Sequence, residues 1–336
     1  MKKNRRWLAA LLIAVLLLAG FGLWRFYRLQ VNRENYHVIA ILKSIARDND
    51  FWPEVEKGIR SAGEQYRMTV EVTGPTLESD VDRQNEIIME SIDKRPDAII
   101  LAPGDYQRSA DYAAKIREAG ITLVLVDSDM AGRSGVTLVA TNNVLAGKKV
   151  GQLLEEAIAK KQEDARTTGQ EKVAILSYIQ NTSTARDRER GVISYLEEKE
   201  IPYIGPFYTQ SNSQTAEEMA TGILQENPDL TYLVGLNEWS AVGASRALIA
   251  MGKQDRVKII GFDSSKSEAK FLEQEVLYGI VAQNPYSMGY LSVESAYKRL
   301  RGKAVLDDID SGSKQITKET MYNLENEKLL FPFSGE

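Results

Sequence analysis

The chain has 336 residues, enough for about two domains with a sizeable core, and its 43% hydrophobic and 26% charged residues are typical of a globular protein. It contains no cysteine and one histidine, His37, which excludes disulfide frameworks, zinc sites built on cysteine or paired histidine, and cysteine nucleophiles. The first thirty residues carry basic side chains and no acidic one, so the remainder has 36 basic against 47 acidic residues, a net charge of −11 that is unsuited to binding nucleic acid.

Residues 1–30 are predicted to form an N-terminal signal anchor. Basic residues precede an unbroken apolar run of 18 residues from Trp7 to Trp24, and Arg25 and Arg28 follow it. As a helix the run covers about 27 Å, close to the hydrocarbon thickness of a membrane and longer than the usual signal-peptide core. The basic residues ahead of the run place the N-terminus inside and the body of the chain outside. An uncleaved transmembrane helix is preferred, and a signal peptide cleaved near Gly20-Phe21-Gly22 is the alternative.

After a short polar linker, strand-like and helix-like segments alternate along the chain. Apolar, β-branched runs predict strands at 37–42, 68–72, 97–101, 122–126, 136–141, 173–176, 231–236, 257–262 and 279–282. Apolar residues at helical spacing predict helices at 52–66, 81–94, 106–118, 144–161, 184–199, 215–226, 239–251 and 286–300. This alternation implies parallel sheets with right-handed crossovers, in which ligands bind at the carboxyl ends of the strands.

Polar and aromatic side chains follow many of these strands. They are Asn49, Phe51 and Trp52 after the first strand, Asp127 after the fourth, Asn143 after the fifth, Arg188 in the segment after the sixth, and Asn237, Asp263 and Gln283 after the last three. Carboxylate, amide and guanidinium groups can each engage two neighbouring hydroxyls of a sugar, while aromatic rings cover its apolar C–H face. Such a site needs no nucleophile and no general acid–base pair. The pattern therefore indicates a binding protein rather than an enzyme.

Several motifs carry a resemblance to a known family. They are NDFW, LVDSD, ATNNVLAG, STARDRERG, GLNEWSAVGA, IIGFDSS and VAQNP. Between residues 36 and 311 the chain resembles the type 1 periplasmic sugar-binding proteins of the ribose, galactose and xylose kind, relatives of the effector domains of LacI-type repressors. The resemblance implies an α/β fold of two Rossmann-like lobes with parallel sheets joined by a three-crossover hinge. It places lobe one at 36–141 plus 284–311 and lobe two at 142–283 plus 312–330.

The resemblance also implies which residues contact the sugar. The family's contacts fall on Asn49, Phe51, Trp52, Asp127, Asn143, Arg188, Asn237, Asp263 and Gln283, with no cofactor and no metal. Two positions depart from the family pattern. Ala102 stands before Pro103 where ribose-type members often have Asn, and Ser211 stands where many members have an aromatic residue. These departures leave the identity of the sugar open.

The same residues also have purely structural interpretations. Asn143 and Asn237 can be turn residues or helix caps, Asp263 can cap the segment that follows it, and the two aromatic residues can belong to the core at a helix start. In the charge run around Arg188, Arg186 and Arg190 share one solvated helix face, whereas Arg188 points away from it. Arg188 is therefore the arginine expected in the site.

The resemblance implies extracytoplasmic capture of a monosaccharide or a similar small polyol by closure of the two lobes. The partner is then an ABC transporter permease or a membrane sensor histidine kinase, and the predicted anchor together with the lack of a lipid-attachment cysteine favours sensing. A membrane-anchored carbohydrate-active enzyme and a binding protein for a non-sugar small ligand are the alternatives. A repressor is disfavoured because the N-terminus carries an apolar segment instead of a helix-turn-helix.

Overall fold

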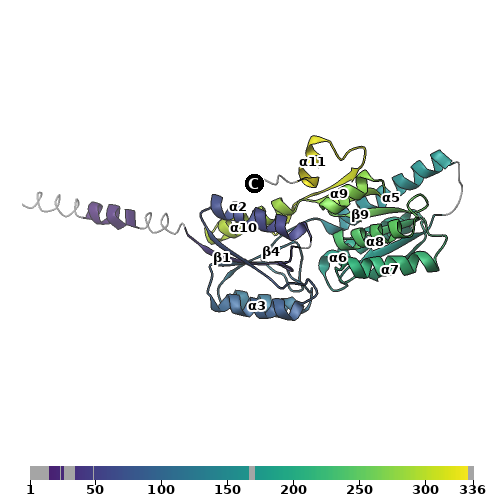
Figure 1. Ribbon diagram of the computed structural model, residues 1–336. Coiled ribbons are helices and arrows are strands. Elements are labelled where there is room, and N and C mark those ends of the chain that lie inside the picture. The colour runs from purple at the N-terminus through teal and green to yellow at the C-terminus, as the bar shows by residue number, and fades with distance from the viewer. Residues whose placement is uncertain (1–14, 23, 26–34, 48, 166–170, 332–336) are drawn as a thin grey trace, which may run out of the picture.

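The first of two sheets combines five consecutive strands with one strand from near the C-terminal end of the described residues. The computed structural model describes residues 15–22, 24–25, 35–47, 49–165 and 171–331 and shows two α/β bodies side by side (Figure 1). The first sheet has the order β11-β5-β4-β3-β1-β2, and all of its strand pairs are parallel. Its strands are β1 (His37–Ile41), β2 (Thr69–Thr73), β3 (Ala98–Leu101), β4 (Thr122–Val126), β5 (Thr137–Ala140) and β11 (Asp308–Asp310).

The second sheet repeats this plan, with the order β12-β10-β9-β8-β6-β7. Its strands are β6 (Val173–Ser177), β7 (Tyr203–Tyr208), β8 (Tyr232–Gly235), β9 (Lys258–Phe262), β10 (Leu277–Gln283) and β12 (Ser313–Thr317). Strand β12 pairs with β10 in the antiparallel sense, so the prediction of purely parallel sheets is wrong at this edge. The α/β class with two parallel-dominated sheets is confirmed.

Helices cover both faces of each sheet, and we name the two bodies by their sheets. Lobe one is the first sheet with α2 (Phe51–Gln65), α3 (Val81–Asp93), α4 (Arg108–Glu118) and α10 (Pro285–Leu300). Lobe two is the second sheet with α5 (Asn143–Ala165), α6 (Ser183–Glu198), α7 (Ser213–Glu226), α8 (Glu238–Ala250), α9 (Lys266–Glu273) and α11 (Leu324–Leu330). Within the described residues the chain passes between the sheets three times, after β5, after β10 and after β11.

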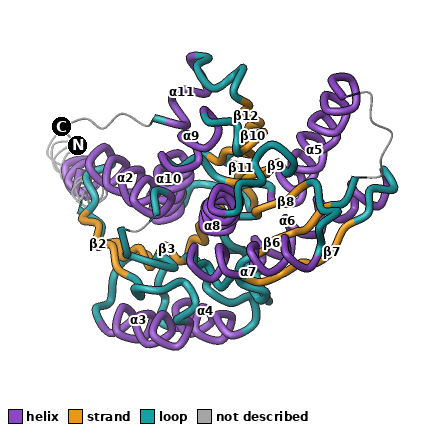
Figure 2. Tube along the Cα trace, turned by 45° about the vertical axis from the view of Figure 1, so that its right-hand side comes forward, coloured by secondary structure: helices purple, strands orange, loops and turns teal. Residues whose placement is uncertain are grey.

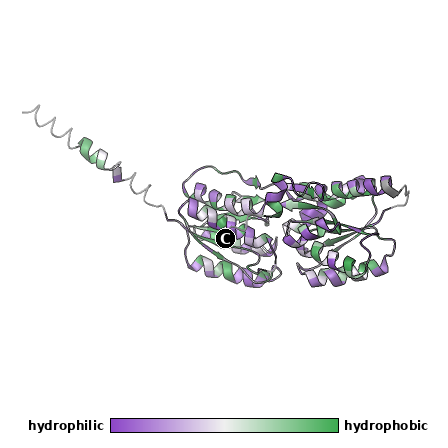
Figure 3. Ribbon diagram, turned by 45° about the horizontal axis from the view of Figure 1, so that its top comes forward, coloured by the Kyte–Doolittle hydropathy of each residue, from purple (hydrophilic) through white to green (hydrophobic). Residues whose placement is uncertain are grey.

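Alternation along the central strands explains why these segments are apolar throughout. In β1, Val38 and Ala40 pack under α2 and α10, whereas Ile39 and Ile41 pack over α3 and α4. Both sets are fully buried, as expected for strands covered by helices on two faces. Figure 2 shows α2 and α10 side by side on one face of the first sheet, and in Figure 3 the helices carry both hydrophilic and hydrophobic residues along their length.

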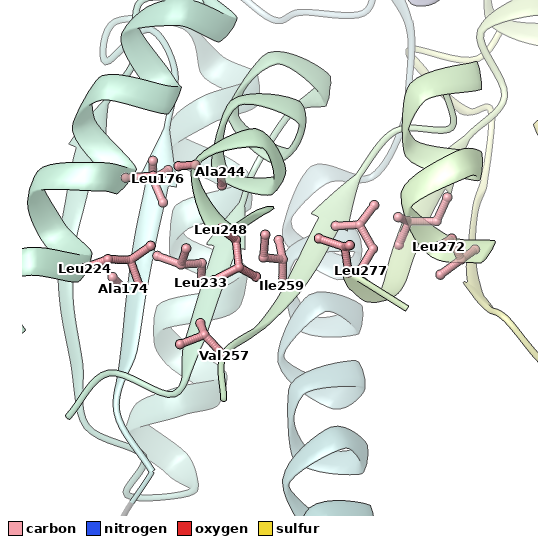
Figure 4. Packing of buried hydrophobic residues seen from close by; sticks show 14 of the residues in the cluster. Ala174, Leu176, Leu224, Leu233, Ala244, Leu248, Val257, Ile259, Leu272 and Leu277 are labelled. Atoms are coloured by element: carbon pink, nitrogen blue, oxygen red, sulfur yellow. The ribbon is translucent and has the colours of Figure 1, made fainter. Parts of the chain in front are cut away.

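The second lobe has an equivalent core. Leu233 and Ile259 on neighbouring strands pack against Leu248 of α8, as the close view in Figure 4 shows. On the opposite face α5 and α6 cover the same sheet. The close-packed cores fix the strand ends, which makes the loops at those ends a rigid frame for a site.

Three described strands were not predicted, and all three are edge strands. Strand β7 contains Gly205 and Pro206, which interrupt its apolar pattern, and its residues are partly exposed. Strands β11 and β12 are short and polar, and both follow the last predicted helix. Edge strands need no apolar face on both sides, so composition gives little signal for them.

The predicted N-terminal anchor falls mainly on residues outside the described part. Residues 15–22 are helical and exposed, whereas 1–14, 23 and 26–34 are not among the described residues. No helix among the described residues has the length and apolar character needed to span a membrane. The signal anchor at residues 1–30 therefore stays a prediction.

Candidate functional site

The two lobes meet around a small polar cavity at the carboxyl ends of their strands. Its lining comprises Lys43, Phe51, Trp52, Glu78, Asp127, Tyr178, Thr184, Arg188, Asn237, Glu238, Trp239, Asp263 and Gln283. Seven of the nine predicted site residues are in this set, and two, Asn49 and Asn143, are not. The cavity encloses about 30 Å³, far below the ~300 to 1,000 Å³ of ordinary small-molecule pockets.

A second cavity of about 240 Å³ adjoins the first near the crossing from β10 to α10. It shares Phe51, Glu238, Asp263 and Gln283 with the first cavity and is bordered by the end of α11. These four residues therefore line both cavities.

Direct hydrogen bonds hold the lobes together around the cavity. The backbone N–H of Tyr106 donates to the carbonyl of Asn181 at 2.9 Å, and that of Asp129 donates to Oγ of Ser183 at 2.7 Å. On another side, Asp50 accepts from the backbone N–H of Lys266 at 2.9 Å. The arrangement is closed, so a ligand of sugar size can enter only after the lobes move apart.

Arg188 lies at the centre of the lobe-two wall. Its Nε donates to Oδ1 of Asn143 at 2.8 Å and its Nη1 donates to the carbonyl of Leu236 at 2.8 Å. The guanidinium carbon lies 3.8 Å from the centroid of the Phe262 ring, a cation–π contact that supports the group from below. Two contacts and an aromatic face fix the arginine, while Nη2 has no hydrogen-bond partner among the described residues.

The close approach of α5 and α6 brings Asn143 to Arg188. A Cβ at Gly147 would lie 2.3 Å from the carbonyl oxygen of Arg188, and one at Gly191 would lie 2.2 Å from that of Val144. Both positions therefore require glycine, because any larger residue would push the helices apart. The ATNNVLAG and STARDRERG motifs thus encode a helix contact as well as the arginine itself.

The lobe-one wall contains a buried ion pair. Nζ of Lys43 lies 2.7 Å from Oδ2 of Asp127, and both side chains are at most 5% exposed. The hydroxyl of Ser128 donates to the same carboxylate oxygen at 2.9 Å. Burial of the pair strengthens its attraction, and removal of one partner would leave an uncompensated charge in the core.

Aromatic side chains form the floor of the cavity. Phe51 and Trp52 meet edge to face with ring centroids 4.9 Å apart, and Trp52 is buried in the lobe-one core. Nε1 of Trp52 donates to Oε1 of Glu78 at 2.5 Å, and the other oxygen of Glu78 accepts from Ser211 of lobe two at 2.8 Å. Trp239 of α8 also packs against the lobe-one core, so it crosses the interface between the lobes.

Several carboxyl groups near the lobe-two wall have raised pKa values. Burial, with the neighbouring Asp263 as the next cause, raises the pKa of Glu238 to about 8. Burial also raises the pKa of Asp263 and, on the lobe-one side, that of Glu78. Glu268 is fully buried behind them, and burial together with the charges of Asp263 and Glu238 raises its pKa well above the ordinary value.

The two predicted residues outside the lining have other contacts. Oδ1 of Asn49 accepts from the backbone N–H of Trp52 at 3.1 Å and so supports the start of α2. Asn143 accepts from Arg188 through Oδ1 and donates to the carbonyl of Thr141 at 3.0 Å. In this arrangement both asparagines position other site residues.

Several residues that line the cavity were not predicted from the sequence. Lys43 and Glu238 each had a usable signal, because Lys43 is the first charged residue after the first strand and Glu238 follows Asn237 directly. Glu78 lies in the loop between β2 and α3, where no strand end marks it. Tyr178, directly after β6, also lines the cavity.

The two departures from the family pattern have different outcomes. Ala102 is buried outside the cavity lining, and its carbonyl accepts from Gln84 at 2.9 Å. Ser211 lies beside the cavity, where it donates to Glu78 and contacts Nδ2 of Asn237 at 3.4 Å.

Known proteins of one family are similar to this chain over most of its length. Residues 41–304 match the family model described as a periplasmic binding protein domain. A D-ribose/D-allose-binding protein of Pseudomonas aeruginosa is 24% identical over 278 residues, covering 80% of this chain and 84% of that protein. A ribose import binding protein of Bacillus subtilis is 25% identical over 272 residues, covering 81% and 85%. The chain belongs to the type 1 periplasmic sugar-binding proteins.

Solved structures agree with this family assignment. A sugar transporter structure from Clostridium phytofermentans is 35% identical, with a TM-score of 0.76, and covers 84% of this chain and 99% of that one. An ABC transporter solute-binding protein of Agrobacterium vitis with bound D-fucose is 29% identical, with a TM-score of 0.80, and covers 88% and 99%. The matching proteins are binding proteins, so the chain is not an enzyme, as the sequence predicted. The family also implies a location outside the cytoplasm.

Proposed function

We propose that this protein captures a monosaccharide or a similar small polyol between its two lobes and closes around it. The observation that carries the proposal is the interlobe cavity, where planar polar groups of both lobes surround an aromatic floor. Hydroxyls of a sugar match the mixed donors and acceptors, and Phe51 and Trp52 supply a face for its C–H groups. The fold's three passages between the sheets supply a hinge, with lobe one at 36–141 plus 284–311 and lobe two at 142–283 plus 312–330.

Seven predicted residues are the proposed direct contacts, and two act through others. The contacts are Phe51, Trp52, Asp127, Arg188, Asn237, Asp263 and Gln283, to which the lining adds Lys43, Glu78 and Glu238. Asn49 and Asn143 are proposed to support Trp52 and Arg188. The relatives bind different sugars, which leaves the sugar of this chain to experiment.

Two kinds of membrane protein are proposed as the partner that recognises the closed state. An ABC transporter permease would receive the sugar, as the import function of the relative from Bacillus subtilis suggests. A membrane sensor histidine kinase would instead detect closure, and the predicted N-terminal anchor favours it because a tethered protein remains beside one partner. Co-purification of the full-length chain separates them: a permease with its ATPase supports import, and a kinase supports sensing.

Calorimetry on the purified full-length chain tests the capture of a sugar. The chain is kept in a detergent without a sugar headgroup and titrated with pentoses, hexoses, deoxy sugars and amino sugars. We expect one sugar per chain to bind without being consumed, and the fluorescence of the cavity tryptophans Trp52 and Trp239 to change with saturation. Binding of amino acids or nucleosides in the absence of any sugar binding would contradict the proposal.

A further inference from the structure

The cavity lining contains more acidic than basic side chains. Of the described residues that line it, Lys43 and Arg188 are basic, and Glu78, Asp127, Glu238 and Asp263 are acidic. A neutral sugar brings no charge to offset this difference. Within an enclosed site of low dielectric, uncompensated charge is costly, so the charge of the ligand matters.

Each lobe contributes two acidic residues and one basic residue to the lining, but only the lobe-one pair is in direct contact. Asp127 is compensated directly by Lys43 at 2.7 Å. Asp263 accepts from Nε2 of Gln283 at 2.5 Å and from the backbone N–H of Glu238 at 2.9 Å, and the positive charge of Arg188 acts on it without a direct hydrogen bond. The Glu238 carboxylate accepts from the backbone N–H of Asp50 at 3.2 Å, and no cation pairs with it among the described residues. Behind these groups lies the buried Glu268, whose Oε1 has no hydrogen-bond partner.

An unpartnered acceptor lies beside the same carboxyl groups. Gln283 is 2% exposed and lines the cavity, and its Oε1 has no hydrogen-bond partner among the described residues. A buried acceptor without a donor is destabilising, which indicates that a donor reaches it in the bound state. This wall of the cavity therefore offers carboxyl and amide acceptors that lack matching donors.

An organic cation fits this need better than a metal ion. Among the described residues no group of three or more carboxylates is arranged to hold a metal. An ammonium group presents three N–H donors and one positive charge in the volume of a hydroxyl-bearing substituent. Its donors match the acceptors of Glu238 and Gln283, which line the same cavity.

We propose that the sugar captured by this protein carries a basic amino group, which lies against Glu238 and Gln283 in the bound state. This inference rests on the proposed capture of a sugar and adds the class of that sugar. Burial and the neighbouring Asp263 raise the pKa of Glu238 to about 8, so its carboxyl group is protonated near neutral pH without a ligand, and a bound cation would favour its ionised form.

Matched pairs of sugars test the inference. The full-length chain is titrated by calorimetry at pH 6 with glucosamine, galactosamine and mannosamine, with their neutral parent sugars, with the N-acetylated derivatives, and with neutral pentoses. We expect at least one amino sugar to bind about tenfold or more tightly than its parent and its acetylated form, because hydrogen bonds to charged groups are the stronger class. The Glu238→Gln variant should reduce this ratio, whereas the exposed control Glu218→Gln should preserve it.

The outcomes distinguish a failure of the amino-group inference from a failure of the proposed sugar capture. A neutral sugar that binds as tightly as every amino sugar would overturn the amino-group inference and leave sugar capture in place. An absence of binding by all sugars would overturn both. The wild-type ratio is decisive by itself if Glu238→Gln fails to fold.

Discussion

Two aspartates occupy equivalent places in the two lobes. Asp127 follows β4 and its backbone N–H donates to Val139 of β5 at 2.9 Å, and Asp263 follows β9 and donates to Val281 of β10 at 3.0 Å. Both have positive φ, 65° and 88°, a conformation that non-glycine residues adopt at a cost. The same local geometry thus directs a carboxyl group into the cavity from each side.

The surroundings of the two aspartates differ. Asp127 has a buried lysine as its partner, whereas Asp263 has neutral donors from Gln283 and Glu238 and a raised pKa caused mainly by burial. Equivalent backbone geometry therefore does not imply equivalent chemistry. We infer that the Lys43–Asp127 pair is a charge-compensated part of the core, and that the carboxyl groups of Asp263 and Glu238 respond to ligand and to pH.

The largest expected effect is on stability, from Lys43→Ala. Removing the lysine leaves Asp127 buried without its cation, which should cost about 3 to 5 kcal/mol of unfolding free energy. Thermal unfolding monitored by circular dichroism should show a melting temperature lower by about 10 °C. Removing one partner of an ion pair at the surface should not lower the melting temperature to a similar extent.

Two further variants sharpen this test. Lys199→Ala removes an exposed partner of Glu155, 2.8 Å away, and should leave the melting temperature nearly unchanged, because solvent screens exposed ion pairs. Lys43→Met combined with Asp127→Asn removes both charges and should recover much of the stability lost by Lys43→Ala. A double variant no more stable than the single one would contradict a compensated pair.

The next effect is on affinity, from Arg188→Ala in the lobe-two half. The variant removes charged donors and leaves Asp263 with less compensation, so binding should weaken by about 2 to 5 kcal/mol, roughly thirtyfold or more. Arg190→Ala is the control, because Arg190 is exposed and pairs with Asp187 at 3.0 Å. Calorimetry with the identified sugar measures both, and equal losses would refute the role of Arg188.

Strand-end positions explain which parts of the site were predictable from the sequence. Carboxyl ends of parallel strands converge, so polar residues placed there, such as Asp127 and Asp263, were predicted to meet, and both line the cavity. The same signal selected Asn49 and Asn143, which lie outside the lining and contact the lining residues Trp52 and Arg188. Position at a strand end predicts proximity to a site but not the direction of the side chain.

Other features depend on contacts that one sequence does not reveal. Lys43 and Asp127 are 84 residues apart, and only the neighbouring ends of β1 and β4 bring them together. Glu78 reaches the cavity from a loop whose path is set by the packing of lobe one. The core strands were predictable because both faces are apolar, whereas the polar edge strands β11 and β12 depend on pairing with distant strands.

The buried carboxyl groups around Glu238 should make the stability of the protein depend on pH. The pKa of Glu238 is raised from its ordinary 4.5 to about 8, and those of Asp263 and Glu268 are raised as well. A carboxyl group with a raised pKa stabilises the folded state while protonated, so its contribution is fully present below pH 4.5 and is lost as the pH rises toward 8. The melting temperature should therefore fall between pH 5 and pH 9, and less steeply in Glu238→Gln. A wild-type melting temperature that rises across this interval would contradict the assignment.

The smallest expected effect separates the sequence prediction for Asn143 from the contact seen in the structure. Asn143 accepts from Nε of Arg188, so Asn143→Ala should weaken sugar binding by about 1 kcal/mol, roughly fivefold, through a less well-oriented guanidinium. If Asn143 acts only through Arg188, adding this substitution to Arg188→Ala should cause no further loss, because two residues in one hydrogen-bonded unit are not additive. If Asn143 touches the sugar itself, as the family resemblance implied, the fivefold loss should persist in the Arg188→Ala background. Calorimetric titration of the two single variants and the double variant decides between these roles, and an additive result would return Asn143 to the set of direct contacts.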